Sequence, residues 1–362
     1  MNKALNIVIA TVMWCGIVAY VVLASRHSDA ERSKITVLSV HAEVVDADQF
    51  GLITESKLSQ WLAEGGGDFV GRTLGEVDTR AIERQLEGHD EVRQARVWVN
   101  LDGVLSVEVA QRQPIMRVWS SNGYRFWMTA DNYILPDVGE FTARVPVVTG
   151  EIPFPFGVTE TGSYDAIVQG VWDDFVDQFT KIEGERRRLV AQKREEQAEI
   201  SEIRAKRAGY FWSKARKEIF AEGKKQQIAP HEQKIAELDA AMKTLAERKN
   251  TLRVKEKKSQ QTHAFLTKLT NFVKLVEGDR FWAGQIVQIN VPAEGEGVLQ
   301  EPVLELIPRV GDYTILLGVL DGREAEKLGK LRTFYTEALP REGWSSARHI
   351  DIRYDNQIVC TK

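Results

Sequence analysis

Apolar and polar residues alternate along Arg96–Trp119, on both sides of Asp102-Gly103, in a pattern typical of two strands joined by a tight turn. Glycine supplies the positive φ that such a turn requires, so the sequence predicts a β-hairpin with its turn at Gly103. Pro114 follows this hairpin. Because proline cannot donate a hydrogen bond to a strand ladder, we expect it at a strand end, where one module gives way to the next.

The residues before this hairpin predict one strand and two helices. A half-buried strand begins at Thr36, one helix follows the capping residue Thr54, and a second helix runs from Asp78 to Gly88. The alternating set of the strand is Thr36, Leu38, Val40, Ala42 and Val44, and the apolar positions of the helices are Leu58, Trp61, Leu62, Ile82 and Leu86. The order over 33–113 is therefore β-α-α-β-β.

After Pro114 the pattern predicts a second, β-rich module, and the fold class is α+β. Its expected strands lie at 115–119, 124–127, 134–136 and 144–150, with a later hairpin from 303–308 and 313–318. A helix that begins near Asp321 is expected to bury Leu328, Leu331 and Tyr335. The predicted closing strand is Ile350–Asp355.

Residues 178–262 interrupt this module and predict two long helices folded into an antiparallel coiled-coil hairpin. The apolar stripe is Ile200, Ile203, Tyr210, Ile235, Leu238, Met242, Leu245 and Leu252, which is close to heptad spacing. Gly223 and Pro230 lie about midway and suggest the turn. Phe211, Trp212, Ile219 and Phe220 lie near the tip, and we favour a core role for them over an exposed contact patch.

The charge of the chain is unevenly distributed. The net charge is −4, whereas residues 181–260 contain 22 Lys or Arg and 13 Asp or Glu and so carry +9, which leaves −13 for the rest. A basic helical face is usually a solvated surface. The sharper hypothesis is that this hairpin touches lipid headgroups or a protein partner. The overall charge gives no indication of a nucleic-acid partner.

The run from Ala4 to Ala24 has 21 residues without a charge, close to the roughly 20 that cross a bilayer as a helix. We predict a cytoplasmic tail and membrane anchor over 1–25, with the N-terminus inside and the body outside. The alternative is a cleaved signal peptide with a small-residue site at Val22-Leu23-Ala24. The residues expected to face lipid are Ile7, Ile9, Val12, Trp14, Ile17, Tyr20 and Val22.

No motif in the sequence indicates catalysis. The two cysteines, Cys15 and Cys360, are not placed to form a disulfide. Asp131 and Asp137 could be proposed as a carboxylate pair, but both are explained as turn residues. The six histidines are scattered without metal-ligand spacing: His27, His41, His89, His231, His263 and His349. We therefore expect no enzyme activity, cofactor, metal or small-molecule substrate.

Several segments resemble one known family. The order anchor, β-α-α-β-β, then Tyr124–Trp127, Ile134–Pro136 and Arg144–Gly150, with the ending Ile350–Asp355, resembles the POTRA and β domains of the FtsQ/DivIB cell-division family. The resemblance covers about 1–165 and 263–362 and implies a single-pass inner-membrane scaffold, with its body in the periplasm and enriched at the division septum. The implied division is a POTRA domain at 33–113 and a β domain at 114–177 and 263–362.

The same resemblance implies a binding site at the C-terminal edge strand for partners like FtsB and FtsL. An exposed strand edge offers unpaired backbone groups to which a partner segment can add as a further strand. The matching positions here are Arg353, Tyr354, Ile358 and Val359. The alternative is that Ile350, Ile352, Tyr354 and Ile358 simply face inward. The chain departs from the family pattern after Asp355, which weakens the match at Ile358 and Val359.

Two other functions fit parts of the sequence. A periplasmic adaptor of an export system also combines an anchor, a long helical hairpin and β domains, but such adaptors usually flank the hairpin with lipoyl-like halves. The β-α-α-β-β order before this hairpin argues against that reading. A membrane-anchored hydrolase would need a nucleophile or metal cluster, and the sequence shows neither.

Overall fold

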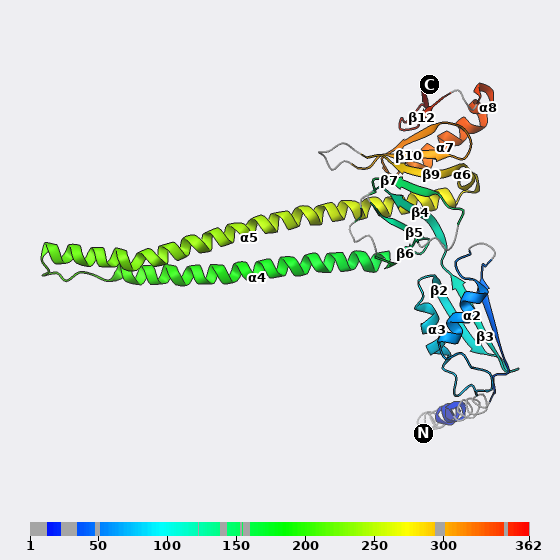
Figure 1. Cartoon of the computed structure of the whole chain (residues 1–362), viewed down its shortest axis with the longest axis horizontal. Helices are drawn as coiled ribbons and strands as arrows, with labels where there is room; N and C mark the ends of the chain where they lie inside the picture. The colour runs from blue at the N-terminus through cyan, green and yellow to red at the C-terminus, as the bar shows by residue number, and fades with distance from the viewer. Residues whose placement is uncertain are drawn as a thin grey trace, which may run out of the picture. The chain divides into compact units, whose positions relative to one another are not determined.

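The computed structural model describes residues 13–22, 35–47, 51–121, 123–137, 143–152, 154, 160–293, 301–343 and 347–361. The chain divides into two compact units, the first of 1–149 with 276–289 and the second of 150–275 with 290–362. Figure 1 labels most of the helices and strands of both. A three-stranded sheet and a large mixed sheet combined with helices give the α+β class predicted from the sequence.

The N-terminal module of the first unit has the predicted β-α-α-β-β order. Its sheet has the strand order β1-β3-β2, in which β1 runs parallel and β2 antiparallel to β3. The elements are β1 Ser39–Val45, α2 Glu55–Glu64, α3 Thr79–Glu87, β2 Val92–Val99 and β3 Val104–Gln111.

Local sequence signals determine where these elements begin and turn. The Thr54 hydroxyl accepts a hydrogen bond from the Lys57 backbone N–H (3.2 Å) at the start of α2, and the Asp78 carboxylate accepts one from Ala81 (3.0 Å) at the start of α3. Gly103 has φ +78° in the turn between β2 and β3. These three features confirm the caps and the turn expected from the sequence.

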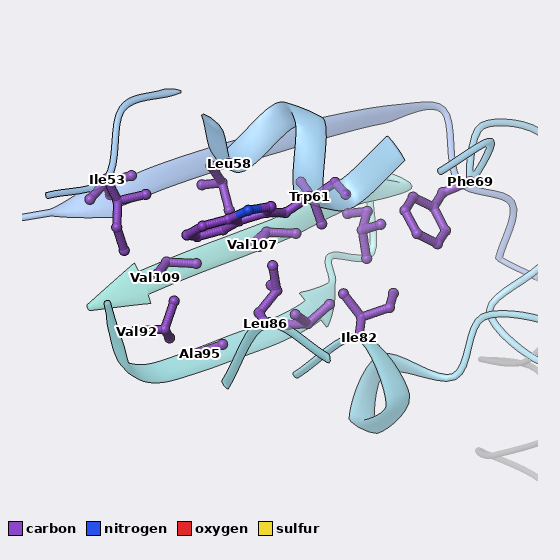
Figure 2. Packing of buried hydrophobic residues seen from close by; sticks show 14 of the residues in the cluster. Ile53, Leu58, Trp61, Phe69, Ile82, Leu86, Val92, Ala95, Val107 and Val109 are labelled. Atoms are coloured by element: carbon purple, nitrogen blue, oxygen red, sulfur yellow. The ribbon is translucent and has the colours of Figure 1, made fainter. Parts of the chain in front are cut away.

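The core of this module lies between the two helices and one face of the sheet. Figure 2 shows Leu58 and Trp61 of α2 and Leu86 of α3 directed toward Val107 of β3. Burying one such leucine contributes roughly 1.5–3 kcal/mol. The same buried cluster includes Trp127 from the following strands, so the core continues past Pro114.

The burial pattern before β1 differs from the expected alternation. Val37 is fully buried, whereas Leu38 is 68% exposed. The reason is that Val37 bonds to the segment around Arg72, with its N–H donating to the Arg72 carbonyl (2.8 Å), while the regular strand begins only at Ser39. The inward-facing phase therefore changes at Leu38, and a strand with one uninterrupted alternation from Thr36 is wrong.

The first unit continues into strands of the large mixed sheet, in the order β9-β7-β4-β5-β6. The pairs β4–β5 and β5–β6 are antiparallel, and Pro114 is the first residue of β4, at a strand end as expected. The elements are β4 Pro114–Ser120, β5 Arg125–Thr129, β6 Tyr133–Pro136, β7 Val147–Gly150, α6 Arg280–Gln285 and β9 Ile286–Val291.

The second unit begins with β8 Gly162–Ser163 and the helical hairpin, α4 Tyr164–Ala205 and α5 Lys214–Glu277. The two helices lie side by side and antiparallel (Figure 1). They extend beyond the predicted 178–262 at both ends. The added part of α5 carries a regular apolar stripe whose members are buried: Phe265, Leu266, Leu269, Phe272 and Val273.

The position of the turn corrects the prediction from glycine and proline. Residues 206–213 connect the helices, and both Gly223 and Pro230 lie inside α5. A proline inside a helix removes one hydrogen bond and bends the helix without ending it when the helix is long and packed. Four residues of the predicted apolar stripe are buried as expected, namely Ile200, Ile203, Leu238 and Leu252. Tyr210, which was also predicted to belong to the stripe, is exposed.

The C-terminal part of the second unit contributes the strand order β13-β12-β11-β10. Strand β12 runs parallel to β11, while the neighbouring pairs are antiparallel. Leu328, Leu331 and Tyr335 are buried as predicted. The elements are β10 Leu304–Pro308, β11 Thr314–Gly318, α7 Glu324–Thr333, η1 Phe334–Ala338, α8 Leu339–Glu342, β12 His349–Asp351 and β13 Val359–Thr361.

Candidate functional site

The candidate docking surface is the C-terminal end of the large sheet, formed by β12, β13 and the loop 352–358 between them. Strand β13 ends the strand order, so among the described residues it has a strand neighbour on one side only. Its pairing with β12 joins Ile350 to Cys360 and Asp351 to Val359. An edge strand of this kind can accept a further strand through its outer backbone groups.

The predicted closing strand 350–355 does not continue as one strand, because β12 stops at Asp351. The Asp351 carboxylate accepts hydrogen bonds from the Arg353 backbone N–H (3.0 Å), Nε (2.9 Å) and Nη2 (2.6 Å). A side chain that bonds the backbone two residues on competes with the strand ladder and turns the chain. The bond from the Arg353 side chain also lowers the pKa of Asp351, against the effect of burial.

Side chains of helix α7 and of its N-cap residue bind the loop 352–358. Lys330 Nζ donates to the carbonyl oxygens of Tyr354 (2.6 Å) and Asp355 (3.0 Å), and Arg323 forms an ion pair with Asp355. Arg323 is in turn fixed by Asp321, at 3.1 Å between Nη2 and Oδ2. Because Lys330 already fixes these backbone carbonyls, the loop has little conformational freedom left to lose when a partner binds. The entropy cost of binding is lower for that reason.

Asp321 organises the start of α7. Burial alone would raise its pKa, but hydrogen bonds from the backbone and side chain of Arg323 and from Lys327 outweigh it and hold the pKa at about 2. Lys327 is itself buried, and its Nζ lies 3.2 Å from the Asp321 carboxylate. The charged pair therefore fixes the helix end from which Lys330 and Arg323 reach the loop.

The four predicted binding residues lie in two places. Arg353 and Tyr354 are exposed in the loop, while Ile358 and Val359 are half-buried at and before the start of β13. Ile350 and Ile352 are fully buried, so the inward-facing reading is right for these two. Sequence reasoning missed the exposed β13 residues Cys360 and Thr361 and the role of Lys330. Nothing in the local pattern around Lys330 indicated a contact 24 residues away.

Hydrogen bonds and ion pairs across the two helices fix the register of the hairpin. As the residue number rises along α4 it falls along α5, from Tyr164–His263 (2.8 Å) through Glu183–Lys249 (3.2 Å) to Glu196–His231 (2.6 Å). Arg204, near the end of α4, also pairs with Glu232 at 3.1 Å. Part of the basic charge of the hairpin is thus neutralised between the helices.

A charged network joins the first module to the strands that follow it, within the first unit. The Arg112 guanidinium stacks on the Tyr133 ring (3.6 Å to its centroid), forms an ion pair with Asp131 and donates from Nε to the Asp90 carbonyl (2.8 Å). The Tyr133 hydroxyl donates to the Asp90 carboxylate at 2.5 Å. Burial and the nearby Asp90 raise the pKa of Tyr133 to about 12.

Asp131 and Asp137 each bind a separate arginine. Asp131 bonds to Arg112 and Thr129, and Asp137 is paired with Arg117 (3.0 Å) and accepts from Trp127 Nε1 (3.2 Å). Each carboxylate thus has its own cation. In the part of the chain that the structure describes, no cluster of three His, Cys, Asp or Glu side chains could hold a metal ion.

The two outer edges of the three-stranded sheet differ. On β2, the carboxylates of Glu83 and Glu87 from α3 accept hydrogen bonds from the backbone N–H groups of Val97 (2.9 Å) and Ala95 (3.2 Å). Helix α3 therefore blocks the edge of β2. Strand β1 forms the other edge of the sheet.

The residues predicted to form the membrane anchor lie only in part within the described chain. Residues 13–22 are helical, and Trp14, Ile17, Tyr20 and Val22 are exposed on this segment. Ile7, Ile9 and Val12 lie outside the described residues. Over the ranges that the structure covers, none of the helices has both the length and the apolar composition to cross a bilayer.

Two family models match the chain. The model for FtsQ/DivIB, C-terminal related, matches residues 229–361, and the model for a POTRA-like domain matches residues 38–110. No curated protein matches the sequence. The POTRA-like match coincides with the β-α-α-β-β module, and the other contains α7, β12 and β13. These matches support an FtsQ/DivIB-type division protein with a POTRA domain.

Proposed function

We propose that this protein is a non-catalytic, single-pass membrane scaffold of the bacterial division complex. Its N-terminus is cytoplasmic and its body lies in the periplasm, enriched at the septum. The uncharged run Ala4–Ala24 supports the anchor, and the family matches support the scaffold role. The β-α-α-β-β module before the hairpin favours this role over an export adaptor.

The observation that carries the proposal is the edge strand β13 beside a loop held on α7. Small FtsB- and FtsL-like partners add a strand to β13, with backbone hydrogen bonds for affinity and the side chains of Arg353 and Tyr354 for specificity. Ile358 and Val359 line the base of the same surface. The loop is already fixed by Lys330 and Arg323, so little ordering accompanies binding.

The POTRA domain supplies the second docking surface. In its sheet, Glu83 and Glu87 cover the edge of β2, which leaves the edge of β1 for a partner. Tethering two docking surfaces to one anchor raises the local concentration of the partners for each other. The scaffold contributes to division through this proximity and through no chemistry of its own.

Localisation tests the division role. A fluorescent fusion expressed from the native locus is expected to form a band at the division site, and depletion of the protein is expected to give undivided filaments. A fusion with residues 356–362 removed tests the C-terminal surface in the same cells. Uniform membrane fluorescence together with normal division after depletion would contradict the proposal.

A further inference from the structure

The turn of the helical hairpin exposes aromatic side chains on a strongly basic background. Tyr210 and Phe211 are 88% and 95% exposed, and no other aromatic side chain of the hairpin, residues 164–277, is exposed. Ile219, in the second turn of α5, is 73% exposed. Large apolar side chains gathered in one exposed place usually mark an interaction surface.

The turn has a defined structure. Lys224 Nζ donates to the carbonyl oxygens of Arg204 (2.7 Å) and Lys206 (2.8 Å) at the end of α4. Because Lys224 already reaches the end of α4, residues 214–223 of α5 project beyond it, accompanied by the connecting segment 206–213 (Figure 1). We call these two segments, 206–223, the tip.

Within the tip, the aromatic side chains of Trp212 and Phe220 pack against each other, and those of Tyr210 and Phe211 are exposed. Trp212 packs edge to face on Phe220 at 5.4 Å, and Arg216 lies over the Trp212 ring at 4.6 Å. Gly209 makes room for this ring, since a Cβ there would lie 2.5 Å from Trp212 Nε1. Phe211, the neighbour of Trp212, is left fully in solvent. Tyr210 and Phe211 are therefore exposed on a turn that is itself well packed.

Most of the charge of the tip is positive, with five Lys or Arg residues against Glu218 and Glu222. Between Glu202 and Glu218 the chain has six Lys or Arg residues and no acidic residue. Farther along the hairpin, cations such as Lys193 and Lys249 are paired across the helices, at 2.5 and 3.2 Å from their carboxylates. In the described structure no carboxylate pairs with the exposed cations of the tip, which are Lys206, Arg207, Lys214, Arg216 and Lys217. Arg216 lies over the Trp212 ring and Lys217 donates to the Tyr210 carbonyl, which leaves Lys206, Arg207 and Lys214 for a partner.

Exposed aromatic rings among unpaired cations match the interface of an anionic bilayer. Aromatic rings favour the headgroup level of membranes, and Lys and Arg are attracted to negatively charged headgroups. We propose that the tip of the hairpin is a second membrane contact, which binds anionic phospholipid through Lys206, Arg207 and Lys214 and inserts Tyr210 and Phe211 at the interface. This contact is independent of the division role.

Flotation with acceptor vesicles tests the proposal on the full chain. The protein is held in nanodiscs of zwitterionic lipid, so that its N-terminal apolar run is already satisfied, and is then mixed with vesicles of phosphatidylcholine alone or with about one third phosphatidylglycerol. We expect binding to the anionic vesicles only, and weaker binding as salt is raised, because headgroup attraction is screened.

Two sets of substitutions separate the tip from the general charge of the hairpin. The combination Lys206→Gln, Arg207→Gln and Lys214→Gln is expected to lower the partition coefficient by about 100-fold, from a factor of about five for each charge. The control removes three exposed lysines elsewhere on α5, with Lys255→Gln, Lys257→Gln and Lys258→Gln, and is expected to bind as the parent does.

Phe211→Ser, which removes the ring and keeps all charges, is expected to weaken binding about tenfold or more, as one buried aromatic ring contributes at an interface. If the two triple variants lose vesicle binding equally, or if the parent binds both vesicle types equally, the proposal is overturned. Absence of binding to anionic vesicles would also overturn it and would favour an acidic protein as the partner of the tip.

Discussion

The side chain of Arg353 crosses directly over the backbone of Gly318, so that a Cβ at position 318 would lie 2.9 Å from Arg353 Cγ. This contact connects the loop after β12 to the end of β11. Arg353, which also donates a hydrogen bond to the Asp351 carboxylate, belongs to the loop of the proposed docking surface. Glycine at 318 is required twice, for this close approach and for its φ of +85°.

Gly318→Ala is expected to lower the free energy of unfolding by about 1–2 kcal/mol, because an L-residue at positive φ is strained. The measurement is chemical denaturation followed by circular dichroism. The control is Gly329→Ala in the middle of α7, where nothing lies within 4 Å of the new Cβ and alanine is the better helix former. If both variants are as stable as the parent, the close approach at Gly318 is not structurally required.

Glu83→Ala with Glu87→Ala is expected to uncover the edge of β2, since two backbone N–H groups lose their acceptors. The free energy of unfolding should fall by about 1–3 kcal/mol for each lost acceptor. The free edge should also increase self-association in sedimentation velocity. Gln at both positions keeps an acceptor oxygen and serves as the control. Unchanged stability and a monomeric state in the Ala variant would show that these carboxylates do not protect the edge.

Acid should weaken the second unit through Asp321. Its pKa is about 2 in the folded protein and 3.8 ordinarily, so the unfolded chain binds more protons between these values. The stabilising contribution is therefore complete above pH 3.8 and is lost as the pH falls toward 2. We expect it to be on the order of 1 kcal/mol, because the carboxylate is partly solvated. Asp321→Asn should flatten this part of the stability–pH curve, and an unchanged slope would contradict the assignment.

Tyr133→Phe is expected to destabilise the first unit by about 1–2 kcal/mol, because the Asp90 carboxylate loses its 2.5 Å hydrogen bond while the ring still stacks under Arg112. Arg112→Lys separates charge from geometry: lysine keeps the charge near Asp131 but loses the planar stacking and the Nε bond. Thermal unfolding of both variants provides the comparison. If both variants melt at the same temperature as the parent, this network does not stabilise the connection between the two modules at Pro114.

Local signals predicted the POTRA domain well, because its boundaries depend on single side chains. Thr54 and Asp78 begin the two helices through their own hydrogen bonds, and Gly103 makes the turn. The apolar face of each helix followed from helical spacing, and the buried Leu58 and Leu86 are its result. Here sequence and structure agree because neighbouring residues carry the information.

Elsewhere, side-chain contacts that the pattern of apolar and polar residues does not reveal decided the outcome. The hairpin turn lies at 206–213 because Trp212 folds onto Phe220 and Lys224 caps α4, whereas Pro230 remains within α5. Strand β12 ends at Asp351 because its carboxylate binds Arg353. The family resemblance could place Tyr354, one of the four predicted binding residues, at the surface. It could not identify Lys330 of α7, which holds the Tyr354 carbonyl.

Binding of the partner segments tests the central claim most directly. The full chain in nanodiscs is titrated with the extracytoplasmic segments of the FtsB- and FtsL-like proteins of the same organism, and calorimetry measures the dissociation constant. Tyr354→Asp and removal of residues 356–362 alter the docking surface. Tyr210→Asp introduces the same charge at another exposed tyrosine, on the hairpin tip, and is the matched control.

We expect saturable binding by the parent and by Tyr210→Asp. We expect affinity at least about tenfold weaker for Tyr354→Asp, which corresponds to about 1.4 kcal/mol, and no measurable binding after the truncation, with folding preserved in all variants. Parent-like affinity in both altered proteins, or no saturable binding by the parent itself, would contradict a docking surface at the C-terminal edge strand.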